Sequence, residues 1–127
     1  NDLIESGETG ALRHTQEDLN SEKNIRIFKE NQIILQNFIN DCSDKNLKII
    51  FVTLPAYKSY REHLNSKQLD VTLQTVVHFD KKYDNVNYLN FLSDSRFTSE
   101  DFQDADHLSA TGATKLSQIV NNIIENP

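Results

Sequence analysis

The stretch Ile49-Ile50-Phe51-Val52-Thr53-Leu54 is short, continuously apolar and largely β-branched, and Pro55 ends it. Such a run is typical of a strand buried on both faces, as in parallel sheets. A second run, Val86 to Phe91, predicts another strand. Between them, apolar residues at helical spacing predict a helix over 70–82, with Asp70 as its N-cap. A strand, a helix and a strand of these lengths form a βαβ crossover, so we expect the two strands to be parallel.

Two further helices flank this unit. Residues 23–43 carry apolar side chains at helical spacing, and residues 109–125 form a second such stripe that Ser109 can cap. The pattern predicts an α/β fold with only two strands, whereas sheets commonly have about four to six. The sheet therefore looks incomplete: the missing strands lie upstream in a longer protein, or a second copy of the chain covers the open edge. We expect the isolated chain to form a homodimer or to be marginally stable.

The amino-acid composition excludes some classes of binding partner. The formal net charge of -6 argues against a nucleic acid or an anionic membrane surface, because both need clustered Lys and Arg. No stretch has the ~20 apolar residues of a membrane span, so no membrane contact by this segment is expected. Residues 1–22 are polar, contain two of the three glycines and predict an irregular lead-in without chemistry, before an α/β region over 23–127. The chain begins without Met and contains none, which favours an excised segment of a longer protein.

An acidic residue and a histidine lie between the second strand and the last helix, at Asp104 and His107. In open α/β sheets, sites form in loops at the carboxyl ends of strands. A carboxylate three residues before a histidine can accept a hydrogen bond from one ring nitrogen, which leaves the other free to take a proton. Asp101 and Asp106 compete for this orienting role. Asp106 is adjacent to the histidine and is expected to point away from the ring, so Asp104 is favoured.

The pattern D-x-x-H-L-x-x-x-G-A is read here as Asp104, His107, Leu108, Gly112 and Ala113. It resembles the last conserved block of SGNH/GDSL hydrolases, and the order of the preceding elements agrees with that family. The resemblance covers the final third of the chain closely. It implies part of a flavodoxin-like three-layer fold and a Ser-His-Asp mechanism, with His107 as general base and Asp104 as its orienter.

The family's other blocks are missing. The dipeptide Asp94-Ser95 has Ser93 where the nucleophile turn has glycine, and we interpret it as a loop coincidence. The oxyanion block Gly-x-Asn-Asp is not matched by Asn40-Asp41, which has Phe38 in the glycine position. A His-Asp pair without a nucleophile and an oxyanion hole should not hydrolyse esters appreciably. The chain alone is therefore expected to be inactive, with the serine upstream.

The resemblance implies that the parent is an esterase or acyl transferase acting on an O-acylated substrate. The order of elements also looks like that of membrane-anchored members that transfer acyl or D-alanyl groups to cell-surface polymers. It thus implies an extracytoplasmic parent and a cell-surface polysaccharide as one candidate substrate. The alternative is a non-catalytic α/β interaction or assembly module with a degenerate SGNH fold. A Gly-Asp-Ser-like turn in upstream sequence would favour the enzyme.

No cofactor or metal is expected. The acidic residues of the loop could hold a hard cation, but their spacing does not match the twelve-residue calcium loop, and a solvated acidic loop is favoured. The other histidines show no metal-ligand spacing. Cys42 is expected to be a small core residue. Tyr57 and Tyr60 could line the mouth of the cleft or pack over the sheet's edge. The acidic residues and histidines considered above as metal ligands are Glu100, Asp101, Asp104, Asp106, His14, His63 and His78.

Overall fold

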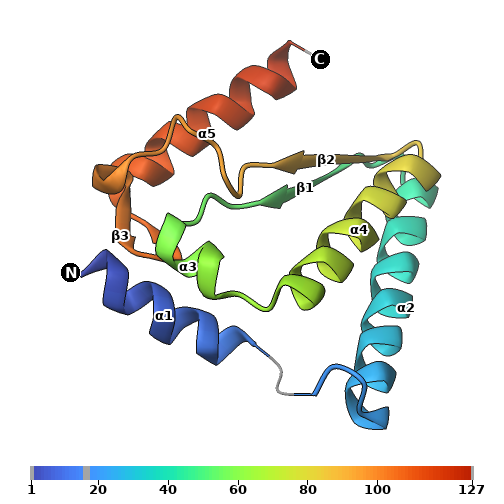
Figure 1. Ribbon diagram of the computed structural model, residues 1–127. Helices are drawn as coiled ribbons and strands as arrows, with labels where there is room; N and C mark the ends of the chain where they lie inside the picture. The colour runs from blue at the N-terminus through green and yellow to red at the C-terminus, as the bar shows by residue number, and fades with distance from the viewer. Residues whose placement is uncertain (1, 16–17, 127) are drawn as a thin grey trace. The chain divides into compact units, whose positions relative to one another are not determined.

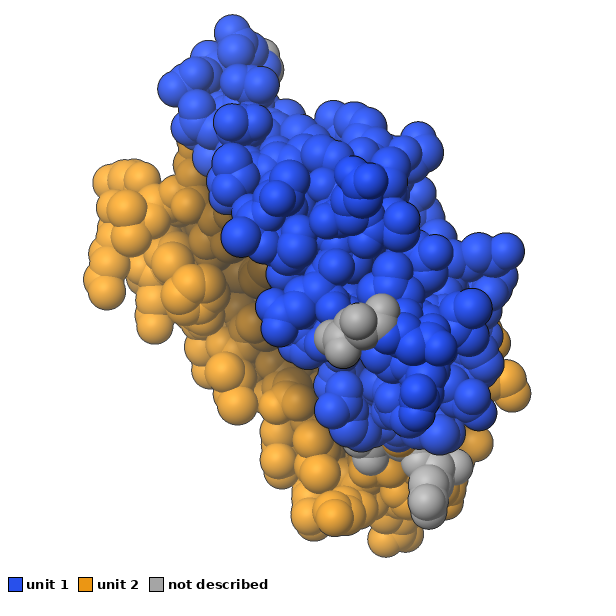
Figure 2. Space-filling view, turned by 90° about the vertical axis from the view of Figure 1, so that its left-hand side faces the viewer, with its two compact units in different colours: residues 1–14, 54–64, 91–127 blue, residues 15–53, 65–90 orange. Residues whose placement is uncertain are grey.

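The computed structural model describes residues 2–15 and 18–126, and it is mixed α/β (Figure 1). These residues fall into two compact units, which Figure 2 colours separately. Unit 1 comprises residues 2–14, 54–64 and 91–126, and unit 2 comprises residues 15, 18–53 and 65–90. The elements in chain order are α1 (Leu3–His14), α2 (Glu22–Asp44), β1 (Ile49–Thr53), α3 (Lys58–His63), α4 (Ser66–Lys82), β2 (Val86–Asn90), the 3₁₀ turn η1 (Ser99–Asp101), β3 (Phe102–Asp104), β4 (His107–Leu108) and α5 (Ala110–Glu125).

Unit 2 contains the predicted parallel strand pair. β1 pairs with β2 in parallel, in a register that runs from Ile49 opposite Val86 to Thr53 opposite Asn90. The Thr53 and Tyr88 hydroxyls lie 2.6 Å apart across this pair. Helices α2 and α4 each contribute one fully buried side chain to the core, and the buried cluster is Ile39, Ile49, Phe79 and Val86. Cys42 packs against this cluster, as expected of a small core residue.

The start of α4 differs from the sequence prediction. The helix begins at Ser66, four residues before the predicted start, because the Asn65 side chain accepts a hydrogen bond from the backbone N–H of Gln68 at 3.0 Å. An asparagine oxygen at this position satisfies a backbone donor that has no partner within the helix. Asp70, the predicted N-cap, is an exposed residue inside the helix.

Burial in unit 2 is lower than the sequence predicted. In β1 only Ile49 is buried, and the other four residues are half-buried, so the prediction of a strand buried on both faces was wrong. On α2 the apolar side chains of Ile33, Ile34 and Phe38 are each at least half exposed. Self-association of the chain through such surfaces stays a prediction. Among the described residues, none of the helices combines the length and apolar character needed to cross a bilayer.

The predicted irregular lead-in is wrong for most of its length, because Leu3–His14 is helical. Gly7, Gly10 and Ala11 are buried, and a Cβ atom on Gly7 would lie 2.1 Å from the Ser59 hydroxyl oxygen and 2.7 Å from the Ser59 carbonyl carbon. The glycine thus lets α1 approach α3 at backbone distance. The Ser59 hydroxyl completes this contact by donating to the Leu3 carbonyl. Residues 16 and 17, also in the predicted lead-in, lie outside the described residues.

Candidate functional site: the Asp104–His107 hairpin

The segment 92–108, between the second predicted strand and the last predicted helix, contains η1 and a short antiparallel hairpin. β3 pairs with β4 so that Asp104 lies opposite His107, with Ala105 and Asp106 as the turn. The buried Ala105 fixes the tip of the hairpin, since its N–H donates to the Ser6 hydroxyl at 3.1 Å and its carbonyl accepts from the Tyr57 N–H at 2.8 Å. The hairpin is therefore held from both sides within unit 1.

The hairpin leads directly into α5, which begins as predicted. The Ser109 hydroxyl accepts a hydrogen bond from the Gly112 N–H at 3.2 Å, and the Ser109 N–H donates to the Asp101 carbonyl at 2.8 Å. A Cβ atom on Gly112 would lie 2.0 Å from that same carbonyl oxygen. The φ angle of Gly112 is not positive, so the backbone conformation does not require glycine at this position. Glycine is required because a larger residue would have no space. The D-x-x-H-L-x-x-x-G-A segment is thus one closely packed structural unit.

Asp104 and His107 are in contact, as the sequence predicted. The Asp104 Oδ1 atom lies 2.8 Å from the His107 Nδ1 atom. An ionised carboxylate can only accept, so Nδ1 carries the hydrogen and donates it. This hydrogen bond, followed by the negative charges of Asp104 and Asp106, raises the pKa of His107 above its ordinary value. Partial burial opposes ionisation of Asp104, but hydrogen bonds from the His107 ring and the Asp106 N–H outweigh it and lower the pKa of Asp104.

The second ring nitrogen of His107 remains available. The side chain is 63% exposed. Within residues 2–15 and 18–126, no hydrogen bond is made by Nε2, whereas Nδ1 is engaged by Asp104. When the ring is neutral and its hydrogen is on Nδ1, the Nε2 lone pair can accept a proton from an incoming hydroxyl group. The arrangement can serve as the base and orienter half of a triad.

Asp106 does not point away from the ring, contrary to the prediction. Its Oδ1 atom lies 3.3 Å from His107 Nδ1, and its side chain is only 5% exposed. Alternation of side chains applies along a strand, but Asp106 is in the turn between β3 and β4, where it does not hold. Neither carboxylate oxygen of Asp106 has a hydrogen-bond partner among the described residues. A buried carboxylate in this state is destabilising, which makes the site unusual.

Helix α1 forms part of the surroundings of Asp106, which the sequence did not predict. Arg13 Nη2 and His14 Nδ1 lie 3.9 and 3.7 Å from Asp106 Oδ2. His14 Nδ1 also lies 2.8 Å from the Tyr60 hydroxyl. Burial, followed by the negative charge of Asp106, raises the pKa of Tyr60. A Cβ atom on Gly10 would lie 3.2 Å from Asp106 Oδ1, so this glycine leaves the space that the carboxylate fills. The sequence feature that could have indicated this close approach of α1 is the pair Gly7 and Gly10 within a helical segment.

The remaining candidates take structural roles. Asp101 is buried and accepts hydrogen bonds from the Lys115 ammonium group and the Thr98 N–H, which lower its pKa. It therefore does not orient His107, and the prediction of a solvated acidic loop is wrong for Asp101 and Asp106. Glu100 is exposed, as that prediction requires. Tyr57 packs edge to face on Phe102, with ring centroids 5.6 Å apart.

The structure also shows the surroundings of the two dipeptides that partly match the family's other blocks, and of Ser6, a serine that lies near the hairpin. Asp94 pairs with Arg96, whose side-chain hydrogen bond lowers the pKa of Asp94 to about 2, in agreement with the interpretation of Asp94-Ser95 as a loop feature. Asn40 and Asp41 are exposed residues of α2. Ser6 approaches the hairpin, but its hydroxyl accepts from the Ala105 N–H and makes no contact with the His107 ring.

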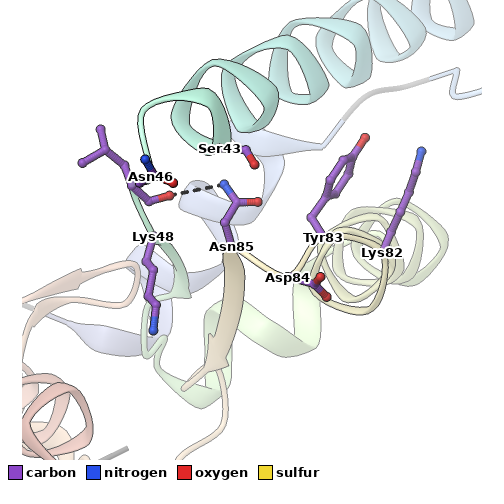
Figure 3. A pocket seen from close by; sticks show the side chains of 8 residues that line it. Ser43, Asn46, Lys48, Lys82, Tyr83, Asp84 and Asn85 are labelled. Carbon is purple, nitrogen blue, oxygen red and sulfur yellow. Dashed lines mark hydrogen bonds between the residues drawn. The ribbon is translucent and has the colours of Figure 1, made fainter.

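Two hollows on the described part of the chain lie away from the Asp104–His107 pair. One of about 450 Å³ lies in unit 2 and is lined by residues that include Lys48, Lys82 and Asp84 (Figure 3). Asn85 Nδ2 donates to the Leu47 carbonyl at 3.3 Å beside it. The other, of about 240 Å³, lies in unit 1 against Arg96 and the end of α5. The 450 Å³ hollow lies where β1 and β2 begin, whereas sites in parallel sheets form where strands end.

Comparison of the chain with models of protein families, with curated proteins and with solved structures found no match. The function of the chain is therefore inferred from the geometry of the hairpin and from the motif within it.

Proposed function

We propose that this chain is the C-terminal part of an SGNH-type hydrolase or acyl transferase that acts on O-acyl esters. The observation that carries the proposal is the 2.8 Å contact between Asp104 Oδ1 and His107 Nδ1, on a ring whose Nε2 atom is free and exposed. His107 is the general base and Asp104 is its orienter. The serine nucleophile and the oxyanion hole come from sequence upstream of this chain.

In the proposed mechanism, His107 Nε2 removes the proton of the serine hydroxyl as its oxygen attacks the acyl carbonyl. The imidazolium ion that forms is stabilised by the Asp104 carboxylate, and it then donates the proton to the leaving alcohol. Attack by water completes hydrolysis, and attack by an acceptor hydroxyl completes acyl transfer. The raised pKa of His107 and the lowered pKa of Asp104 support this assignment, because both favour the charged pair that the reaction passes through.

The fold and the wider setting belong to the same proposal. The parallel pair of β1 and β2, followed by the hairpin and α5, has the order expected of the last part of a flavodoxin-like three-layer domain. The close approach of Gly112 to Asp101 gives a physical reason for glycine in the motif. We propose an extracytoplasmic parent that acts on an O-acylated cell-surface polymer, and this part derives from the resemblance alone.

Labelling with a fluorophosphonate, which reacts with activated serines, tests the proposal. The isolated chain should not be labelled, whereas the polypeptide extended upstream should be labelled at one serine. His107→Ala should abolish labelling of the extended polypeptide, and His78→Ala, which alters an exposed histidine on α4, should not. Labelling of the isolated chain, or of no serine in the extended polypeptide, would contradict the proposal.

An interaction or assembly module is the second candidate. The exposed apolar side chains of Ile33, Ile34 and Phe38 on α2 favour it, because surfaces of this kind commonly bind other protein surfaces. An extended polypeptide that folds but carries no reactive serine would make this the leading function.

A further inference from the structure

The most unusual group in the described part of the chain is the Asp106 carboxylate. The Asp106 side chain is only 5% exposed. Neither of its carboxylate oxygens accepts a hydrogen bond from the described residues. The nearest donor, His107 Nδ1, has one hydrogen and directs it at Asp104. The contacts to Arg13 and His14, at 3.9 and 3.7 Å, are too long for hydrogen bonds. Burial of a carboxylate without a hydrogen-bond donor is destabilising unless another group binds there.

We propose that Asp104, Asp106 and His107 bind a divalent transition-metal cation, with Zn²⁺ as the favoured ion. One ligand atom from each of the three residues can be chosen so that all lie within 4.8 Å of one another. Asp104 Oδ1 and Asp106 Oδ1 lie 2.8 and 3.3 Å from His107 Nδ1. Two donors that are each about 2.1 Å from a zinc ion stand roughly 3.0 Å apart at right angles and roughly 3.4 Å apart at the tetrahedral angle. The 3.3 Å separation lies within this range, and the 2.8 Å separation is close to its lower end.

The donor set favours zinc over the hard cations. One imidazole nitrogen and two carboxylate oxygens suit Zn²⁺, whereas Ca²⁺ takes six to eight oxygen ligands and Mg²⁺ keeps most of its water. Because the Asp104 side chain is 26% exposed, water can complete the coordination shell at the Asp104 side of the cluster. The cation would take the place of hydrogen on Nδ1. A neutral ring would then carry its hydrogen on Nε2, and a protonated ring would release one proton to solvent. The cation would also give the Asp106 carboxylate a direct contact.

Zinc binding and base catalysis would exclude each other, because both use His107 Nδ1 and the Asp104 carboxylate. Zinc binding itself does not depend on the proposed hydrolase function. It can be measured on the isolated chain without any activity, so failure of one proposal is distinguishable from failure of the other.

Calorimetric titration of the metal-free chain with ZnCl₂ tests the site. We expect one equivalent of Zn²⁺ to bind and to raise the thermal unfolding midpoint, and CaCl₂ to do neither. Asp106→Asn should weaken zinc binding by at least about tenfold, because a neutral amide replaces a charged ligand. Glu100→Gln alters an exposed acid four residues before the end of β3; it is the matched control and should bind like the wild type.

Nitrogen-15 shifts of the histidine rings keep the test decisive if Asp106→Asn folds poorly. In the wild-type chain, zinc should shift the His107 Nδ1 signal strongly and leave His63 and His78 unchanged. No binding by the wild type, binding through Nε2 or another histidine, or unchanged affinity in a folded Asp106→Asn variant would overturn the proposal.

Discussion

Replacing His107 with alanine in the upstream-extended protein is expected to lower kcat for a short-chain aryl ester by at least roughly 10⁴-fold, because loss of a triad base is among the most severe changes in serine hydrolases. Asp104→Asn should cost roughly 10³- to 10⁴-fold, since an amide in place of the carboxylate no longer holds the hydrogen on Nδ1. Steady-state kinetics near pH 8 would measure both effects, with circular dichroism confirming that each variant is folded.

Two matched variants distinguish the loss of a catalytic group from a general effect of substitution on the protein. His78→Ala changes an exposed histidine of unit 2 and should leave kcat within about twofold of the wild type. Asp106→Asn should lower kcat less than Asp104→Asn, because Asp106 accepts no hydrogen bond from the ring. Full activity of Asp104→Asn, together with a loss below tenfold for His107→Ala, would rule out the proposed roles.

Gly112→Ala is expected to destabilise the isolated chain by about 2–3 kcal/mol, at the upper end of the cost of overpacking. The new methyl group would lie 2.0 Å from the Asp101 carbonyl oxygen and 2.9 Å from its carbon. Both are backbone atoms, and the carbonyl oxygen also accepts the Ser109 N–H, so relief would require movement of the helix start. The higher helix propensity of alanine, about 1 kcal/mol, offsets only part of this cost.

Urea unfolding provides the measurement for Gly112→Ala. Ala113→Gly is the matched control, because Ala113 is exposed in the same helical turn and should lose only about 1 kcal/mol through helix propensity. The close approach of α5 to Asp101 would be wrong if Gly112→Ala were neutral or stabilising.

The elements that the sequence predicted well are those with long apolar periodicity or a clear cap. Helix α2, the parallel pair of β1 and β2, and the Ser109 cap of α5 follow from local patterns of this kind. The contact between Asp104 and His107 was predictable for the same reason, since a spacing of three residues within a tight turn fixes it.

The elements that the sequence missed depend on contacts between distant residues. Gly7 and Gly10 lower helix propensity, but they permit α1 to pack on Ser59 and Tyr60, more than forty residues away along the chain, and that packing stabilises the helix. β4 has two residues and β3 has three, too few for any periodicity to appear. The burial of Asp106 follows from both, since the turn directs it toward the space left by Gly10.

The ring hydrogens and titration of His107 in the metal-free chain test the base and orienter pair most directly. Long-range nitrogen-15 correlation spectra across a pH series would identify which nitrogen of the neutral ring carries the hydrogen. We predict hydrogen on Nδ1 and a pKa above the ordinary histidine value of about 6.5, since Asp104 stabilises the protonated ring, and Asp104→Asn should lower that pKa. Hydrogen on Nε2, or a His107 pKa at or below 6.5 that Asp104→Asn leaves unchanged, would contradict the pair.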